Sequence, residues 1–347
     1  MTQWYDWDRT MSYGARITMV IGGKGIGKTF GLRRKALRRA VNRDDRFVEI
    51  SRRTKSLPGI ERNWAGKLEL LGMAPKGYEY STKSHILRGT HGDMSRDLGY
   101  FASLNDLEDV KTGTYPGVQW VIMDEALIDR RLNPTHHYKR GEWELLGKLI
   151  DSIVREDGRD TERQKPRLFL LSNAVSLDNP YFRVLGITKM PEYGYHWYLD
   201  QQFLLHFVNP HEYEGIGDGT LSGIMLGAVD KRDESFGNRF ADADTAFIAK
   251  RPPNLKFCYT LVYCRRKVGV WIERTDAARV YMDGWHMADG VVYALTPDDA
   301  RPDRITATRQ SGMLKLLCNL YYAGRLLYSD VSTRALTLEM LAPYGLH

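Results

Sequence analysis

The sequence predicts an α/β fold in which a mainly parallel sheet lies between layers of helices, and three stretches carry this prediction. The first is a glycine-rich loop between an apolar strand and an amphipathic helix, within residues 17–41. The second and third are apolar strands, at 118–123 and 167–171, and each of them ends in polar residues. Residues that follow the carboxyl ends of parallel strands meet at one edge of a sheet, which is where such proteins bind their ligands.

The glycine-rich loop runs from Gly22 to Thr29 and matches the phosphate-binding pattern G-x-x-x-x-G-K-T. Its glycines let backbone N–H groups converge on phosphate oxygens, Lys28 supplies a positive charge, and the Thr29 hydroxyl is a ligand for Mg²⁺. The β-branched run 17–21 predicts the strand before the loop, and 30–41 predicts a helix whose N-terminus faces the phosphates. We therefore expect ATP and Mg²⁺ to bind here. The expected nucleotide-binding residues are Gly22, Gly23, Lys24, Gly25, Ile26, Gly27, Lys28 and Thr29.

The second strand ends in the consecutive acids Asp124 and Glu125, which is the Walker B arrangement. We expect Asp124 to hold Mg²⁺ together with Thr29, and Glu125 to act as the general base that polarises the attacking water. Neighbouring carboxylates repel each other unless a cation sits between them. An ordinary strand-to-turn junction also shows Asp-Glu, but the preceding phosphate loop favours the catalytic interpretation.

The third strand is followed by Asn173, and a packed helix predicted at 142–154 is followed by Arg155. An amide at the edge of the sheet can sense the γ-phosphate or the attacking water, so Asn173 is the candidate sensor; the alternative is a turn cap. An arginine that reaches a neighbouring subunit's nucleotide is worth ~10³–10⁵ in rate, but Arg155 could equally cap its own helix. Spacing alone leaves Arg155 and Arg159 undecided.

Composition limits the other possibilities. The chain has 347 residues, of which 43% are hydrophobic, so it can form two domains or one domain with an appendage. No apolar run approaches the ~20 residues that span a bilayer, and the N-terminus lacks the layout of a signal peptide, so we expect neither a membrane nor a secreted protein.

Positive charge is concentrated early in the chain. The net charge is +7, and the segment 28–55 holds eleven Lys and Arg residues against three acids. We interpret Arg52, Arg53 and Lys55 as contacts to a DNA backbone. The helix residues 33–35 fit a solvated helix face equally well.

Beyond residue 208 the pattern changes. The Gly- and acid-rich run 212–227 predicts a hinge that leads to a small helical linker. Apolar stretches at 257–263, 268–272 and 291–295 predict antiparallel strands, and a helix follows at 313–324. We accordingly expect an ATPase domain at 1–208, a linker at 209–250 and a third domain at 251–347. The aromatic-rich run 193–207 is expected to be core.

The third domain has the basic residues Arg265, Arg266 and Lys267 at a predicted hairpin tip, which indicates nucleic-acid binding. Glu273 and Asp283 fall near strand ends, but no third carboxylate accompanies them. Since a two-metal nuclease needs several converging carboxylates, we expect no cleavage there.

The sequence resembles the DNA-packaging ATPases of phi29-like tailed bacteriophages. The resemblance rests on residues 20–28, on 121–125 and above all on 171–182, and it extends weakly to Asp299. It implies a P-loop ATPase domain of the ASCE (RecA-like) class, a helical linker and a C-terminal α+β RNase H-like domain, a vestigial nuclease. In that family the ATPases form a ring, a pentamer, around a packaging RNA and the portal of the procapsid, and pump double-stranded DNA into it.

Residue-by-residue transfer from this family implies further roles. Arg155 matches the trans-acting arginine finger, Lys111 a second trans-acting position and Lys55 a lysine that grips DNA. The acidic residues 156–158 stand where the family is basic, so Arg159 receives no role. The resemblance also implies the cytoplasm of an infected bacterial host as the location, with transient attachment to the procapsid.

Two alternatives to a DNA-translocating motor stay open. One is a terminase that also cuts DNA. The other is a nucleotide-dependent phage assembly or export ATPase, although export ATPases carry a membrane segment that this sequence lacks.

Overall fold

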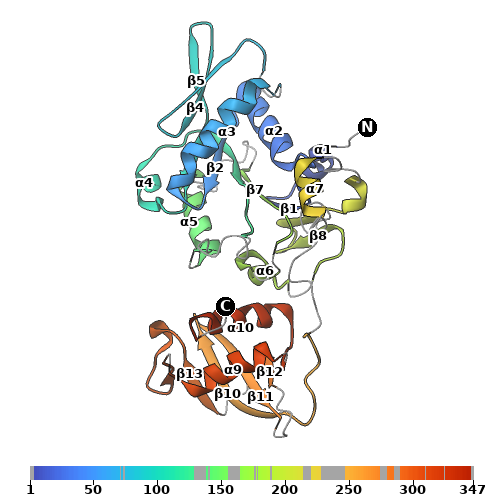
Figure 1. Cartoon of the computed structure of the whole chain (residues 1–347). Coiled ribbons are helices and arrows are strands. Elements are labelled where there is room, and N and C mark those ends of the chain that lie inside the picture. Colours follow the sequence, from blue (N-terminus) through green and yellow to red (C-terminus); the bar gives the residue numbers. More distant parts are fainter. Residues whose placement is uncertain are drawn as a thin grey trace. The chain divides into compact units, whose positions relative to one another are not determined.

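The computed structural model divides into two compact units, Met1–Ser176 with Pro191–Phe240, and Leu177–Met190 with Ala241–His347 (Figure 1). The structure describes residues 4–70, 72, 75–128, 138–139, 141–154, 165–175, 177, 179–187, 190–213, 220–227, 247–273, 280–284, 290–308, 310–323 and 325–344.

A nine-stranded sheet forms the centre of the first unit, with the strand order β3-β4-β5-β2-β6-β7-β1-β9-β8. In this order, the six strands from β5 to β9 run parallel to one another. At the two ends of this group, β4 pairs antiparallel with β5, and β8 pairs antiparallel with β9. The strands are β1 (Ile17–Ile21), β2 (Arg46–Ser51), β3 (Glu79–Lys83), β4 (Ile86–His91), β5 (Met94–Ser103), β6 (Val118–Met123), β7 (Arg167–Ser172), β8 (Gly194–Tyr198) and β9 (Phe203–Phe207).

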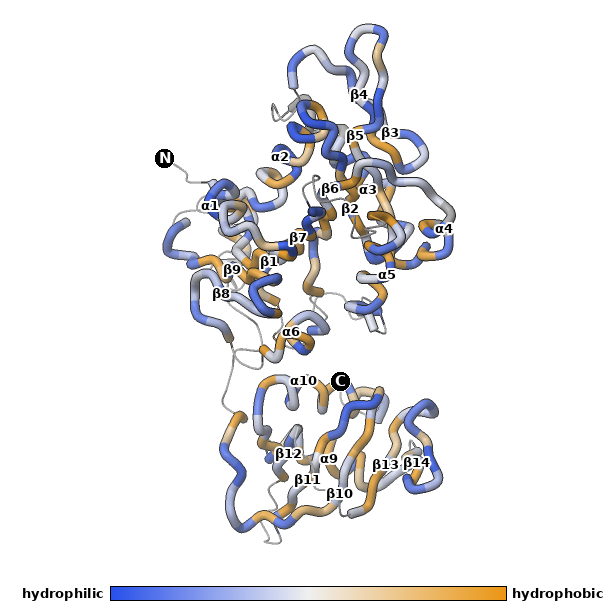
Figure 2. The backbone as a smooth tube through the Cα atoms, turned by 180° about the vertical axis from the view of Figure 1, so that it is seen from behind, coloured by the Kyte–Doolittle hydropathy of each residue, from blue (hydrophilic) through white to orange (hydrophobic). Residues whose placement is uncertain are grey.

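The described part of the first unit also contains helices. They are α1 (Trp7–Ser12), α2 (Lys28–Arg43), α3 (Leu57–Leu70), α4 (Leu107–Thr112), α5 (Glu142–Val154) and α7 (Leu221–Gly227). Residues of α1, α2 and α3 share one core with alternate residues of β1, β2, β6 and β7, such as Val20, Ile122 and Phe169. The intervening residues of these strands point to the other face, and α5 packs against β6. Figure 2 shows the hydrophobic stretches along β1, β2 and β6. The result is the expected three-layer arrangement.

The helix α2 begins two residues before the predicted range 30–41, and it buries the apolar face that the pattern predicts. Its residues Leu32, Ala36, Leu37, Ala40 and Val41 are all buried. This stripe at positions i, i+4, i+5, i+8 and i+9 fits the 3.6-residue period of a helix that covers a sheet.

The interpretation of Arg33 as part of a solvated helix face, one of the two that the sequence left open, is wrong. The Arg33 side chain is 7% exposed and forms an ion pair with Glu49 of β2, which is 1% exposed. The indole N–H of Trp64 also donates to Glu49, at 2.6 Å, and burial raises the pKa of this carboxyl. A buried charge needs such partners, because an unpaired one carries a large desolvation cost.

The second unit contains a six-stranded sheet with the order β14-β13-β10-β11-β12-β15. Its strands are β10 (Lys256–Tyr263), β11 (Arg266–Ile272), β12 (Val280–Asp283), β13 (Val291–Ala294), β14 (Ile305–Thr306) and β15 (Leu326–Tyr328). Its helices are α6 (Pro180–Leu185), α9 (Gly312–Tyr322) and α10 (Val331–Leu341). Apolar residues of α9 and α10 share a core with β10, β11, β12 and β15.

Two expectations for these strands need correction. The strands β10 and β11 are antiparallel as expected, but β13 pairs with β10 in parallel. Parallel neighbours require a crossover connection, which an apolar stretch does not reveal.

The second correction concerns the aromatic-rich run 193–207 of the first unit, which we expected to be core. Its strand β9 is buried throughout, whereas Trp197 of β8 is 38% exposed because β8 forms the edge of the sheet.

None of the helices in the described ranges is both long and apolar enough to cross a bilayer.

Candidate active site

The three polar stretches singled out in the sequence follow three adjacent strands. In the sheet, β7 lies between β6 and β1 and is parallel to both. The register pairs Ile21 with Ser172 and Met123 with Leu170, so all three strands end at nearly the same level. The phosphate loop, Asn173 and the Asp124–Glu125 pair therefore meet at one edge. A strand between the loop strand and the acidic strand is the order of the ASCE class.

Glycine geometry shapes the phosphate loop. Gly25 and Gly27 have φ angles of 86° and 84°, in the left-handed region that side chains rarely adopt. Gly22 has no room for a side chain, because an added Cβ would lie 2.8 Å from Ile26 and 3.1 Å from Val208. The loop thus needs glycine at these positions, and α2 starts directly after Gly27 with its N-terminus open to an anion.

The amine of Lys28 is buried inside the loop. Its Nζ donates to the carbonyl oxygens of Gly22 and Gly23, both at 2.7 Å, and to Oδ1 of Asn173 at 3.2 Å. Burial lowers the pKa of Lys28 to about 8, and the negative charge of Asp124 partly opposes this shift. The structure therefore brings Lys28 and Asn173 into contact, with Asp124 near enough to influence the amine.

The backbone that follows the Asp124–Glu125 pair is held by hydrogen bonds to β7. The backbone N–H of Glu125 donates to Oδ1 of Asp124 at 3.0 Å. Glu125 has a φ of 54°, which is unusual for a residue with a side chain and typical of functional positions. The next two residues bond to β7: Ala126 N–H donates to the carbonyl of Leu171 at 2.8 Å, and Leu127 N–H donates to Oγ of Ser172 at 3.2 Å. Glu125 itself is exposed.

Thr29 and Asp124 offer the oxygen donors for a metal. A hydroxyl and one carboxylate fit Mg²⁺, which binds few protein ligands and completes its shell with water and substrate phosphates. The described residues include no group of three or more Asp, Glu, His or Cys side chains placed to hold a metal.

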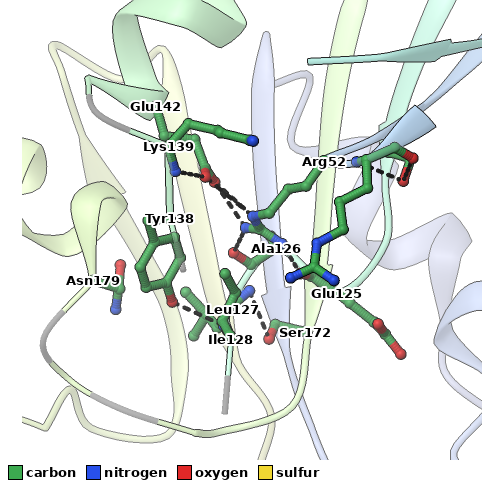
Figure 3. A network of polar contacts seen from close by, with 12 residues as sticks. Arg52, Glu125, Ala126, Leu127, Ile128, Tyr138, Lys139, Glu142, Ser172 and Asn179 are labelled. Carbon is green, nitrogen blue, oxygen red and sulfur yellow. Dashed lines mark hydrogen bonds and ion pairs between the residues drawn. The ribbon is translucent and has the colours of Figure 1, made fainter. Parts of the chain in front are cut away.

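Arg52 does not point outward as a DNA contact would. Its guanidinium forms an ion pair with Glu142, with Nη2 at 2.8 Å from the carboxylate, and Nε donates to the same group at 2.9 Å. Nη1 donates to the carbonyl of Glu125 at 2.5 Å, and Nη2 donates to that of Ala126 (Figure 3). The ring of Tyr138 lies 5.2 Å from the guanidinium carbon. Because the guanidinium is committed to these internal partners, it is not available as the DNA contact that the sequence predicts.

Glu142 is bound to this site through Arg52, and sequence reasoning missed it. It is the first residue of α5 and is 0% exposed, and it also accepts the N–H of Lys139 at 2.9 Å. An acid in the first turn is ordinary in a helix, since it favours the helix dipole. Its position in the sequence therefore gave no sign that it pairs with an arginine 90 residues away.

The N-terminal segment is a second feature that was missed. Tyr5 N–H donates to the carbonyl of Ile26 at 2.9 Å, and the indole N–H of Trp7 donates to that of Lys28 at 2.9 Å. The ring of Trp4 lies against Gly27, where a Cβ would collide with it. The segment before β1 thus supports the phosphate loop from outside.

The other candidate residues lie as follows. Lys55 is exposed in the short turn Thr54–Ser56 that follows β2, and Arg53 is half-buried just before it. Lys111 is exposed on α4, where it pairs with Glu108 at 2.7 Å. Arg155 and Arg159 follow α5 and lie outside the described residues, so their roles stay predictions.

Comparison with known proteins identifies a family that matches nearly the whole chain. Residues 1–344 match the family model of the podovirus DNA encapsidation protein (Gp16). The DNA packaging protein of Bacillus phage B103 is 25% identical over 334 residues, covering 95% of this chain and 98% of the relative. That of Bacillus phage phi29 is 23% identical over 340 residues, covering 97% and 96% of the two chains.

Solved structures show the same fold. A chain of the bacteriophage phi29 genome packaging motor assembly matches with a TM-score of 0.74 and 22% identity, covering 99% of both chains. A chain of the Phi-28 gp11 DNA packaging motor matches with a TM-score of 0.63 and 19% identity, covering 100% of this chain and 98% of the other. The fold class predicted from the sequence is confirmed. The matched family is also the one that the motifs indicated, and the chain belongs to the family of podovirus DNA encapsidation proteins.

Proposed function

We propose that this chain is the ATP-hydrolysing subunit of a motor that translocates double-stranded DNA into a preformed phage capsid. The observation that carries the proposal is the meeting of Lys28, Asn173 and the Asp124–Glu125 pair at the ends of three adjacent strands. A buried amine inside a glycine loop, next to a sensor amide and a carboxylate pair, fits a triphosphate better than any other ligand. Relatives that span nearly the whole chain carry the name DNA packaging protein.

Each residue has a distinct task in this proposal. The loop N–H groups and Lys28 bind the β- and γ-phosphates, and Lys28 exchanges its bonds to the Gly22 and Gly23 carbonyls for phosphate oxygens. Mg²⁺, held by Thr29 and Asp124, would neutralise the charge that develops on the phosphates. Glu125 takes a proton from the attacking water, and Asn173 contacts the γ-phosphate or this water.

Arg52 positions Glu125 without touching the substrate. Its guanidinium holds the carbonyls of Glu125 and Ala126 while Glu142 fixes the guanidinium in turn. The backbone that carries the general base is thereby tied to both β2 and α5. A general base needs hydrogen-bond reach to the water it activates, so a loosened backbone would slow hydrolysis.

We infer that the active form is a homo-oligomeric ring, and that it is a pentamer as in the family that the sequence resembles. This ring acts at the portal of the procapsid, with a packaging RNA as a further partner. Arg155 completes the site of the adjacent subunit, and Lys111 is a second group offered to that site. Such a ring works in the cytoplasm of the infected host.

The domain assignment that we propose keeps an ATPase domain at 1–208, a linker at 209–250 and a nucleic-acid-binding domain at 251–347. The exposed Lys55 and its neighbour Arg53 contact the DNA backbone. We also propose that the third domain binds nucleic acid without cutting it, since Glu273 and Asp283 have no third carboxylate at a corresponding position in the sequence pattern.

The proposal is tested by ATP hydrolysis of the oligomeric full-length protein with and without double-stranded DNA. DNA should stimulate hydrolysis by the wild type, and Lys28→Ala should abolish both rates. Absence of stimulation would favour a nucleotide-dependent assembly or export factor. Nicking of plasmid DNA in the presence of Mg²⁺ would favour a terminase with an active nuclease.

A further inference from the structure

A hollow of about 460 Å³ opens on the first unit, away from the phosphate loop. It is lined by the second half of α2 and by residues at the starts of β6 and β7, including Gln119 and Arg167. The phosphate loop follows the end of β1, which is parallel to β7, and β7 is parallel to β6. The hollow therefore lies at the opposite edge of the sheet and cannot belong to the nucleotide site.

The lining of this hollow is strongly basic. Its cations are Lys35, Arg38, Arg39, Arg43, Lys165 and Arg167, and its acid is Asp8. Six positive charges against one negative charge leave an excess of five. This basic hollow contains most of the positive charge of α2, which the nucleotide site does not use.

Part of this charge is balanced internally and part is not. Lys35 pairs with Asp8 at 2.6 Å, and Arg39 pairs with Asp45 at 2.6 Å. Arg38, Arg43 and Lys165 are exposed and form no ion pair with any residue in the described ranges. Arg38 and Arg43 of α2, and Lys165 just before β7, are therefore exposed lining residues of the hollow without an ion pair in the described part of the chain.

Arg167 shows how crowded the cations are. Its side chain makes one long hydrogen bond, at 3.4 Å, to the carbonyl of Met11. Burial lowers its pKa, and the positive charges of Arg39 and Arg16 lower it further. Like charges held together in this way are stabilised when an anion binds between them.

The spacing of the cations suits a run of phosphates. On α2 the lining residues stand at positions i, i+3, i+4, i+7 and i+8, which form one face of a helix and span about 12 Å at 1.5 Å per residue. Four of the six cations are arginines, whose planar forks bind phosphate oxygens in pairs. Attraction to the helix dipole explains only a cation in the last turn, such as Arg43, and not Lys165 or Arg167, which lie outside this helix.

We propose that the basic hollow binds the phosphodiester backbone of a nucleic acid, at a site separate from the phosphate loop and from Arg53 and Lys55. A nucleic-acid backbone is favoured over an acidic protein surface because the arginines of the basic hollow outnumber its lysines. Their guanidinium groups are also spread over the length of several phosphates. RNA and DNA share this backbone chemistry, so the site recognises the charge and spacing of the phosphates in either one. The inference does not depend on ATP hydrolysis, because binding is measurable without nucleotide.

The test uses Arg38→Ala/Arg43→Ala in the full-length protein. Both side chains are exposed, so the fold should be kept, which circular dichroism and the midpoint of thermal unfolding check. The matched control is Lys76→Ala/Lys83→Ala, which removes the same charge from exposed positions elsewhere in the first unit. Fluorescence anisotropy measures binding of a labelled RNA duplex and a DNA duplex of equal length without ATP, over a series of salt concentrations.

We expect the arginine double variant to weaken binding of at least one duplex by about tenfold at low salt, and the lysine control to weaken it far less. For DNA, the slope of log affinity against log salt should fall by about 1.8, since each lost phosphate contact is worth about 0.9. Weakening of only one duplex identifies the ligand as RNA or DNA. Equal losses in the two double variants, or no loss in either, would overturn the proposal. So would a loss confined to binding of polyglutamate, which would indicate an acidic protein instead.

Discussion

The pair formed by Arg52 and Glu142 gives a prediction with a defined magnitude. The Glu142 carboxylate is 0% exposed, and the Arg52 side chain is 13% exposed. Replacing Arg52 by Met removes the guanidinium that forms the ion pair with Glu142. Breaking a buried pair leaves an uncompensated charge and costs about 3–5 kcal/mol. The N–H of Lys139 still donates to Glu142, so we expect the lower end, about 3 kcal/mol.

Urea unfolding followed by tryptophan fluorescence measures this cost, and Arg88→Met is the matched control. Arg88 pairs with Asp97 at 2.8 Å, but the two side chains are 43% and 30% exposed. An exposed pair of this kind contributes about 0–1 kcal/mol. Adding Glu142→Gln to Arg52→Met should restore much of the lost stability, because the amide removes the buried charge and keeps an acceptor for Lys139.

Measuring ATP hydrolysis distinguishes a positioning role of Arg52 from a purely structural one. In the stabilised double variant the carbonyls of Glu125 and Ala126 still lack their donor, so ATP hydrolysis should stay low while ATP binding is retained. The reasoning is refuted if Arg52→Met costs no more than Arg88→Met. Full hydrolysis in the double variant would mean that the pair serves stability alone.

Three further predictions concern the nucleotide site. Because the pKa of Lys28 is about 8 without nucleotide and the charged amine binds phosphates, ATP affinity should fall about tenfold from pH 7 to pH 9; a flat profile in a fluorescent-nucleotide titration would contradict this. Gly27→Ala should prevent ATP binding, because φ is 84° and the new Cβ meets Trp4, whereas Gly59→Ala, which has open space in α3, should not. Arg155→Ala subunits should be inactive alone and regain hydrolysis when mixed with Lys28→Ala subunits; no rescue would place Arg155 in its own subunit or in a structural role.

The local elements of the site could be predicted because their signals are local. The strand–loop–helix from β1 to α2 and the acidic end of β6 depend on neighbouring residues, so periodicity and turn chemistry reveal them. The structure agrees with these expectations in the left-handed φ of Gly27 and in the buried face of α2.

Pairings between distant residues could not be predicted in this way. Arg33 and Arg52 both looked like surface cations, yet each is held by a buried acid, Glu49 or Glu142, from another element. The parallel pairing of β13 with β10 was missed for the same reason. Which partner a charge or a strand meets depends on the tertiary fold, and a single sequence carries no signal for it.

The central claim is that a triphosphate bound at the phosphate loop is hydrolysed with Glu125 as the base. Nucleotide binding and single-turnover hydrolysis by Glu125→Gln test it most directly, since this change keeps the shape of the side chain and removes its basicity. We predict ATP affinity close to that of the wild type and a rate lower by about 10²–10⁴. A variant that binds ATP and still hydrolyses it at a near wild-type rate would contradict the account.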